Sequence, residues 1–485
     1  MRITYSPRAL QILARAGLLV IFAGLLPASA QQPTVLTHAT IIDGTGGPPV
    51  SDGTIVITNG KIAAVGKSAA VERPAGAREI NAAHKFIIPG LMDANVHLVL
   101  NRSIEFHARY EGHYEDLIEE AAQVELKNGV TTVFDSWGPL QPLMNVRDRI
   151  KRGEVVGSRM FVAGNIVGLS GPLGPDFNPL AATAATPEFV KRINHLYEEN
   201  VGPDLLYRTP DEVRVEIRKY IARGIDFLKY AAAGHGRGRI YFLMFSPESQ
   251  RAIVEECHRA GIIAQTHTMT VESLRQALQA GIDMGQHMEI TGPEPLPDDL
   301  IRMMLARKIY AGVQPFTARR VKIVIEDEGA DPEQVLQTQM SNPNIVRLLK
   351  GGVPLLLASD AGLRDPDDVA SQKPRTTIDR PYDLPTGVFL WFQAMHENGM
   401  EPIAEILAAT RNIAAAYHKL DQLGTLEKGK VADLVVLDAD PLLDINNIRK
   451  ISLVMKEGQV VDRDKLPLKK VLSLPRTPTH ATTRD

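Results

Sequence analysis

Residues 89–97 read PGLMDANVH, and this stretch decides which fold the rest of the chain must fit. A Pro-Gly pair leads into apolar residues typical of a buried strand, which ends in Asn95-Val96-His97. Residues two apart in an extended strand share a face, so the Asn95 amide and the His97 imidazole point to the same side. The strand therefore brings two potential ligands to one place at its carboxyl end.

Seven further apolar strands are predicted downstream, separated by helical stretches. They span residues 131–135, 160–163, 227–231, 262–267, 285–289, 309–313 and 354–358. This alternation over residues 91–417 favours an α/β fold, a (β/α)8 TIM-like barrel, over a doubly wound sheet. The segment of residues 168–210 is long and is interrupted by Pro and Gly, and we expect it to lie over the barrel mouth.

Polar side chains stand at four more of these strand ends, where barrel active sites are assembled. They are Lys229, His267, His287 and Asp360. Each alone has an ordinary structural interpretation: a hydrogen-bonded histidine, a lysine that reaches solvent, or an aspartate at a helix N-cap. Their occurrence together with His97, at the ends of successive strands, predicts a metal site.

The sequence pattern predicts short strands at both ends of the chain, outside this alternating region. Residues 34–40, 54–58 and 61–66 precede it, with Asn59-Gly60 as a hairpin turn, and residues 433–437 and 451–456 follow it. The ends therefore form small sheets. We expect residues 466–485 to be a disordered tail.

The composition excludes several kinds of function. With 54 Lys and Arg against 57 Asp and Glu, the net charge of -3 predicts a small-molecule partner and no nucleic acid. Cys257 is the single cysteine, so an intrachain disulfide and a multi-thiolate metal cage are excluded. The sequence also has no Gly-rich dinucleotide fingerprint after an early strand and no Gly-x-Ser-x-Gly elbow.

The first 30 residues have the pattern of an export signal. A basic region holds Arg2, Arg8 and Arg15, and the apolar run of residues 16–26 is too short for a stable membrane span. Ala28-Ser29-Ala30 supplies the small residues of a cleavage site. We expect cleavage near Ala30 and a periplasmic or secreted protein with no membrane span in the mature chain; an uncleaved anchor is the alternative.

Three segments resemble the metal-dependent amidohydrolase superfamily. Residues 89–97 are similar to its strand-one signature, residues 424–437 (GTLEKGKVADLVVL) to its closing segment, and residues 410–415 (TRNIAA) to the helix before that segment. The resemblance extends over nearly all of residues 35–461. It implies a composite β-sandwich domain, built from residues 31–90 and 418–465, beside a barrel of residues 91–417.

The same resemblance implies a metal centre. Its ligands would be Asn95, His97, His267, His287 and Asp360 together with Lys229, carboxylated on its side-chain amine (N6) and bridging two metals. We expect a divalent metal, Zn with Co or Mn as alternatives, at one or two ions per chain. Metal-activated water would attack the substrate, with Asp360 as proton shuttle.

Asn95 departs from the His-x-His that the superfamily usually carries on strand one. An amide oxygen is a poorer donor to Zn²⁺-type ions than imidazole, so the metal nearer this strand should be held weakly or be missing. The substitution is typical of a small branch that hydrolyses phenylurea herbicides and the thiocarbamate molinate. The export signal is also similar to that of exported Xaa-Pro dipeptidase-type members. A dead enzyme is the alternative, but the other metal positions are intact.

These observations predict a hydrolase that cleaves a C–N bond of an amide, urea or carbamate. The alternatives are an exported dipeptidase or carboxypeptidase acting on peptides or N-acyl amino acids, and a catalytically silent ligand-binding barrel. We also expect a homo-oligomer.

Substrate contacts are sought in the loops after the strands. His235 is predicted as a catalytic donor and substrate contact, and Tyr230 and Arg237 as substrate contacts. An arginine could also grip a substrate carboxylate or be a solvated loop charge; the candidates are Arg237, Arg239, Arg319 and Arg320. The apolar cluster of residues 242–245 could line a pocket or pack as core.

Overall fold

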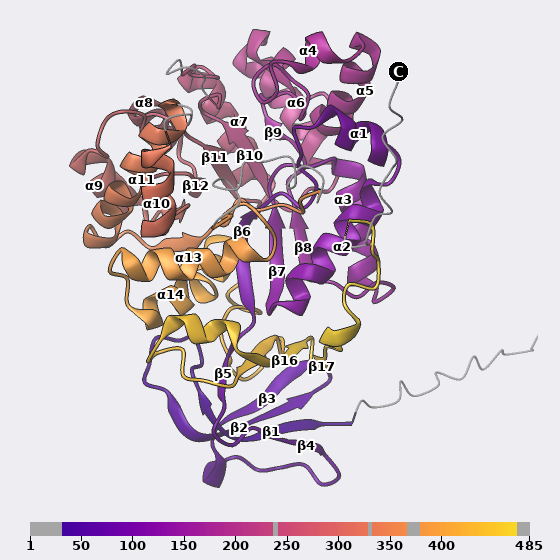
Figure 1. Ribbon diagram of the computed structural model, residues 1–485, viewed down its shortest axis with the longest axis vertical. Helices are drawn as coiled ribbons and strands as arrows, with labels where there is room; N and C mark the ends of the chain where they lie inside the picture. Colours follow the sequence, from indigo (N-terminus) through magenta and orange to yellow (C-terminus); the bar gives the residue numbers. More distant parts are fainter. Residues whose placement is uncertain (1–31, 236–240, 328–331, 366–378, 473–485) are drawn as a thin grey trace, which may run out of the picture.

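The computed structural model describes residues 32–235, 241–327, 332–365 and 379–472. Figure 1 shows a larger α/β part above a smaller part made mainly of strands. Residues 1–30, predicted as the export signal, lie outside the described residues. No helix in the described ranges is long and apolar enough to cross a membrane.

The α/β part is built on parallel strands, and each predicted barrel strand coincides with an observed one. One sheet has the order β6-β7-β8 and the other the order β14-β13-β12-β11-β10-β9. Their bounds are β6 Leu91–Val96, β7 Val130–Asp135, β8 Arg159–Val162, β9 Ile166–Val167, β10 Leu228–Ala231, β11 Ala264–His267, β12 Met284–Gln286, β13 Tyr310–Val313 and β14 Leu355–Leu357. β12 ends before His287, so the strand predicted over residues 285–289 is shorter than expected.

The two parallel sheets are linked by the short chain between β8 and β9 and by backbone hydrogen bonds between the end of β6 and the residues after β14. Three residues separate the end of β8 from the start of β9, and β9 pairs with β10. On the other side, the His97 amide donates to the Ala361 carbonyl (2.9 Å), and the Asp360 amide donates to the Asn95 carbonyl (2.8 Å). The chain has the parallel α/β arrangement of a TIM-like fold.

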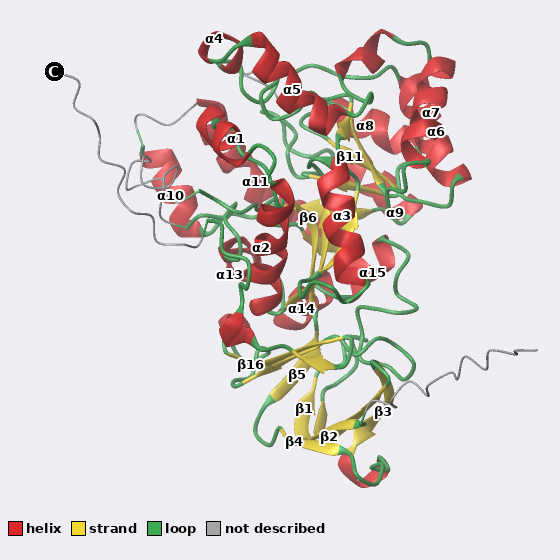
Figure 2. Ribbon diagram, turned by 90° about the vertical axis from the view of Figure 1, so that its right-hand side faces the viewer, coloured by secondary structure: helices red, strands yellow, loops and turns green. Residues whose placement is uncertain are grey.

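Helices alternate with these strands along the chain and surround the sheets in Figure 2. They are α1 Ile104–Tyr110, α2 Tyr114–Lys127, α3 Leu140–Lys151, α4 Ala181–Ala184, α5 Pro187–Glu198, α6 Pro210–Ile221, α7 Pro247–Arg259, α8 Val271–Ala280, α9 Asp298–Arg307, α10 Ala318–Glu326, α11 Pro332–Lys350, α13 Thr386–Glu397, α14 Pro402–Ala408 and α15 Arg411–Ala416. α6 illustrates why these segments are helical. A capping box formed by Thr209 and Glu212 begins the helix, and Val213, Ile217 and Tyr220 are buried on one face of it.

Strands from both chain ends share one eight-stranded sheet with the order β17-β16-β15-β5-β1-β2-β3, with β4 beside β1. Their bounds are β1 Thr34–Ile41, β2 Val50–Thr58, β3 Lys61–Lys67, β4 Arg78–Asn81, β5 Phe86–Pro89, β15 Leu434–Leu437, β16 Ile451–Lys456 and β17 Gln459–Val460. The predicted hairpin turn is confirmed: Asn59 and Gly60 join β2 to β3 with φ of 50° and 75°.

The tail predicted over residues 466–485 is wrong for its first part. Leu466 and Leu472 are buried, and the backbone amides of Val471 and Leu472 donate to Glu120 Oε2 at 2.6 and 2.8 Å. A side chain of α2 thus satisfies backbone groups that sequence patterns leave unassigned. Residues 473–485 lie outside the described part.

Candidate active site

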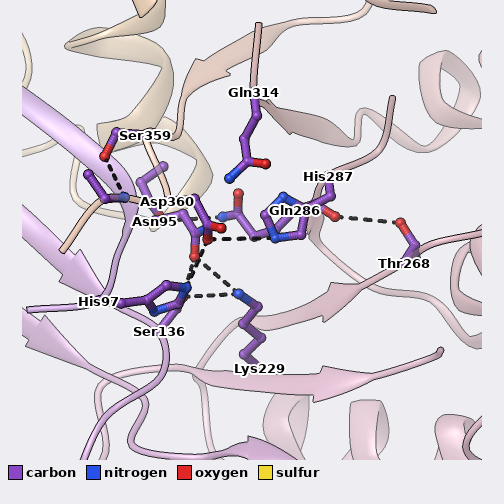
Figure 3. Close-up of polar contacts among 12 residues, drawn as sticks. Asn95, His97, Ser136, Lys229, Thr268, Gln286, His287, Gln314, Ser359 and Asp360 are labelled. Carbon is purple, nitrogen blue, oxygen red and sulfur yellow. Dashed lines mark hydrogen bonds and ion pairs between the residues drawn. The ribbon is translucent and has the colours of Figure 1, made fainter. Parts of the chain in front are cut away.

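The structure brings together the six residues predicted as metal ligands at the carboxyl ends of the parallel strands, and Figure 3 shows five of them. Asn95 belongs to β6 and Lys229 to β10, and His267 is the last residue of β11. His97, His287 and Asp360 follow the ends of β6, β12 and β14. His287 and Asp360 have left-handed backbones, with φ of 60° and 56°. Such backbones are rare outside glycine and often mark functional sites.

Asp360 lies at the centre of the polar contacts (Figure 3). Its Oδ1 accepts a hydrogen bond from Asn95 Nδ2 (2.6 Å), and His97 Nε2 lies 2.8 Å away. His287 Nε2 is 3.7 Å from the same oxygen. Burial alone would raise the pKa of the Asp360 carboxyl, but interactions with His287, His97 and Lys229 outweigh it and hold that pKa well below its usual range. The carboxylate is therefore ionised at neutral pH.

Lys229 is fully buried and points at the Asn95 amide. Its Nζ lies 3.1 Å from Asn95 Oδ1 and 3.1 Å from Ser136 Oγ, and Ser136 Oγ also donates to Asn95 Oδ1. Burial lowers the pKa of Lys229 to about 8, so a larger fraction of the amine is neutral than in an exposed lysine. A neutral amine is the form that can be carboxylated.

The imidazoles at the site have nitrogens without hydrogen-bond partners among the described residues. Both ring nitrogens of His267 are buried and unpartnered, as are Nδ1 of His97 and Nδ1 of His287. Burial lowers the pKa of His267 well below its ordinary value and that of His287 to about 3, so these rings are neutral. Buried polar atoms are normally paired, so open nitrogens on neutral imidazoles are available as ligands.

The donor set fits a divalent metal ion in its chemistry. Neutral imidazoles, an ionised carboxylate and a buried amine of lowered pKa are the groups that such a centre requires. Over the described ranges, however, no three His, Cys, Asp or Glu side chains are already arranged as a metal-binding group. The fit therefore depends on the donor types and their open nitrogens.

His235 also reaches the site, from the loop after β10. Its ring centroid lies 4.7 Å from that of His267 and 5.4 Å from that of Trp137, on which it stacks. The Trp137 ring also meets His97 edge-on at 6.1 Å. Trp137 therefore lies between the two imidazoles.

Tyr230 is not a substrate contact, and its prediction is corrected. Its hydroxyl lies 3.2 Å from Gln250 Oε1 on α7, and the side chain is fully buried. Alternate residues of β10 face opposite sides, so Lys229 enters the site while Tyr230 packs against the surrounding helices.

The other loop residues predicted as substrate contacts differ in where they lie. Arg237 and Arg239 lie outside the described residues. Arg319 is exposed, whereas Arg320 is buried. The predicted apolar cluster is split: Phe242 is 64% exposed and Phe245 is 5% exposed.

Sequence patterns missed three neighbours of the site. Ser136 and Trp137 directly follow β7, and a polar residue at a strand end was the one available signal for Ser136. Asp176 comes from the loop between β9 and α4, and its Oδ2 lies 2.5 Å from His235 Nδ1. Nothing in its local sequence marks that contact.

Comparison with known proteins identifies the family. The profile of the amidohydrolase family matches residues 86–461. The chain belongs to the amidohydrolase family. The resemblance stated from the sequence is thus confirmed.

Two solved structures are similar to this amidohydrolase over almost their whole length. Molinate hydrolase is 39% identical with a TM-score of 0.88, and the match covers 93% of this chain and 99% of the other. Phenylurea hydrolase B is 36% identical with a TM-score of 0.87, covering 92% and 100%. Ochratoxinase from Aspergillus niger is 24% identical over 451 residues, 88% of this chain and 86% of that protein. The amidohydrolase is therefore an enzyme of the hydrolase class.

Proposed function

We propose that this amidohydrolase is a metal-dependent enzyme that cleaves a C–N bond of amide, urea or carbamate type in a small molecule. The observation that carries the proposal is the arrangement of the buried Lys229 amine and the partly buried Asp360 carboxylate around buried imidazoles whose nitrogens are unpartnered in the described structure. The names of the molinate and phenylurea hydrolases support this substrate type.

The residues that would hold the metal are His97, His267, His287, Asp360 and Lys229, the last carboxylated on its amine. A bound divalent ion, Zn or alternatively Co or Mn, would lower the pKa of water to about 7 and so make hydroxide available at neutral pH. One or two ions per chain are expected.

Asn95 would be a weak ligand. Its Oδ1 already receives contacts from Lys229 and Ser136, and its Nδ2 donates to Asp360. The amide oxygen is neutral and already accepts a hydrogen bond from Ser136, and it is a poorer donor to a Zn²⁺-type cation than imidazole. We therefore infer fewer than two tightly held ions per chain.

Asp360 would carry the proton. As an ionised carboxylate it can accept a proton from the attacking water and return it to the leaving nitrogen. The overall reaction adds water across the C–N bond and yields an acid and an amine. His235 stacks on Trp137 and lies beside His267, and we expect it to contact the substrate.

The experiment is a comparison of Asp360→Asn with the wild type on dipeptides, N-acyl amino acids, anilides, ureas and carbamates, with metal analysis of each protein. We expect kcat/KM to fall by about 100-fold or more while the protein remains folded. Asp438→Asn, an exposed partner of Lys85 in the eight-stranded sheet, is the matched control. An unchanged kcat/KM in Asp360→Asn would refute the proposed chemistry.

One observation favours a second candidate, a dipeptidase- or carboxypeptidase-type enzyme acting on peptides or N-acyl amino acids. Arg320 lies in the first turn of α10, which follows β13, and is 8% exposed. Its Nε has no hydrogen-bond partner in the described residues. Because a buried guanidinium normally needs an anion, a substrate carboxylate would be a suitable partner.

Arg320→Met tests this candidate against the first. For a carboxylate-bearing substrate we expect KM to rise by about tenfold or more, with no change for neutral amides or ureas. Arg319→Met, at the exposed neighbouring position, is the control. Equal KM values for both substrate types in the variant and the wild type would exclude a carboxylate contact.

We further infer that the two parallel sheets close into a (β/α)8 barrel and that the eight-stranded sheet is the core of a composite β-sandwich domain. Export through residues 1–30 and homo-oligomeric assembly also remain proposals. N-terminal sequencing of the secreted protein should begin at Gln31, and light scattering should give a multiple of the chain mass. A retained N-terminus or a monomeric mass would refute the respective proposal.

A further inference from the structure

We infer that Asp176 is a positioning residue of the active site, which holds His235 with its proton on Nδ1 and leaves Nε2 as a hydrogen-bond acceptor for the substrate. The substrate contact rests on the proposed function. The placement of the His235 ring rests on geometry alone.

Asp176 binds His235 through both carboxylate oxygens. Oδ2 lies 2.5 Å from His235 Nδ1, and Oδ1 accepts a hydrogen bond of 3.1 Å from the His235 backbone amide. The carboxylate also lies against Gly234, where an added Cβ would come within 2.9 Å of Oδ1. The segment that carries Asp176 therefore packs closely against the backbone at Gly234.

Aromatic rings fix the orientation of the His235 imidazole. Trp137 stacks on it at 5.4 Å with an interplanar angle of 24°, and Phe177 lies at 5.3 Å. Trp137 is itself held, because its Nε1 donates to Asn165 Oδ1 at 2.9 Å. Rotation of the imidazole away from His267 would break these contacts.

The contact joins two loops at the site. His235 follows a short antiparallel pair in which Gly234 donates to the Phe242 carbonyl (3.0 Å) and Met244 donates to the Ala232 carbonyl (3.1 Å). Asp176 belongs to residues 168–210, the segment predicted to lie over the barrel mouth, and is 59 positions away in sequence. Asp176 thus couples that segment to a residue 4.7 Å, ring to ring, from His267.

The carboxylate determines which nitrogen carries the proton. A carboxylate accepts hydrogen bonds, so Nδ1 must be the donor, and in the neutral ring Nε2 is then an acceptor instead of the donor predicted from the sequence. Nε2 can accept the N–H of a scissile amide or of the departing amine. No bond to His235 forms or breaks.

Asp176→Asn is the decisive variant because it keeps the shape and inverts the tautomer. The backbone amide of His235 can only donate, so it retains the one remaining oxygen, and the new NH₂ group must face Nδ1. That group donates to Nδ1, and the ring proton moves to Nε2. We expect kcat to fall by about 10- to 100-fold with unchanged metal content and unchanged melting temperature.

A double-mutant cycle separates positioning from general structural support. In a His235→Gln background, Asp176→Asn should lower kcat no further, since its effect acts through the imidazole. Asp52→Asn is the matched control. Asp52 Oδ1 lies 2.7 Å from His38 Nδ1, and this exposed Asp–His pair belongs to the eight-stranded sheet. An equal loss of kcat in both backgrounds would overturn the inference.

Nitrogen NMR of His235 tests the inference without turnover. The wild type should show the proton on Nδ1 and Asp176→Asn should show it on Nε2. A wild-type ring protonated on Nε2 refutes the role of Asp176 even if the enzyme is active. Inverted tautomers in a protein that hydrolyses none of the panel would instead support Asp176 and count against the proposed function.

Discussion

Glu405 in α14 should make the stability of the protein fall as pH rises, and Glu405→Gln should remove that dependence. Its side chain is fully buried, and neither carboxylate oxygen has a hydrogen-bond partner in the described residues, although His396 Nδ1 lies 3.4 Å from Oε1. Burial, with a smaller contribution from Glu401, raises the pKa of Glu405 from 4.5 to about 9.

The sign and size follow from proton linkage. Below pH 4.5 the folded and unfolded states both hold the proton, so Glu405 makes no pH-dependent contribution to stability. Between pH 4.5 and about 9 only the folded state holds it, and the free energy of unfolding falls by about 1.4 kcal/mol per pH unit. The cost reaches about 3 kcal/mol at pH 7 and is complete above the folded-state pKa.

Urea unfolding at several pH values between about 5 and 8.5 measures this effect. The difference in unfolding free energy between Glu405→Gln and the wild type should grow steadily with pH. Glu72→Gln, at an exposed loop position, should follow the wild type throughout. Parallel stability curves for Glu405→Gln and the wild type would refute an elevated pKa at this site.

Three further perturbations test the site and the core. Lys229→Met should lower kcat/KM by about 100-fold or more and release metal, measured by elemental analysis; retained metal and activity would exclude Lys229 as a ligand. Asn95→His should add a second ion that resists mild chelation, and an unchanged metal count would show that the Asn95 amide is not what weakens the site. Phe134→Ala should destabilise the fold by about 3 to 5 kcal/mol in urea unfolding, because Phe134 stacks on Tyr417 at 3.6 Å and on Phe161 at 4.9 Å. A loss below about 1 kcal/mol would contradict that packing.

The strands and their polar ends could be predicted because both depend on local pattern. Lys229 and Tyr230 are neighbours, and the alternation of a strand assigns one to the site and the other to the helices. His267 was predictable in the same way as the last residue of β11. His287 and Asp360 were identified by type and order, although their left-handed backbones carry no sequence signal.

Contacts between distant segments could not be predicted. Asp176 meets His235 because two loops pack together, and no periodicity encodes that approach. Glu120 likewise binds the backbone of residues 471 and 472 from α2, which converts an apparent tail into packed structure. Side chains that satisfy remote backbone amides are properties of the tertiary fold.

The pairing of β5 with β15 has a consequence for how the chain acquires its structure. Pro89 pairs with Leu434, a separation of 434 − 89 = 345 residues. Until the second strand arrives, β5 exposes an apolar edge that includes Ile87 and Ile88, and unpaired edges of this kind attract other chains. Closure over such a distance is slow, so the nascent protein needs protection from aggregation until nearly all of it is available to fold.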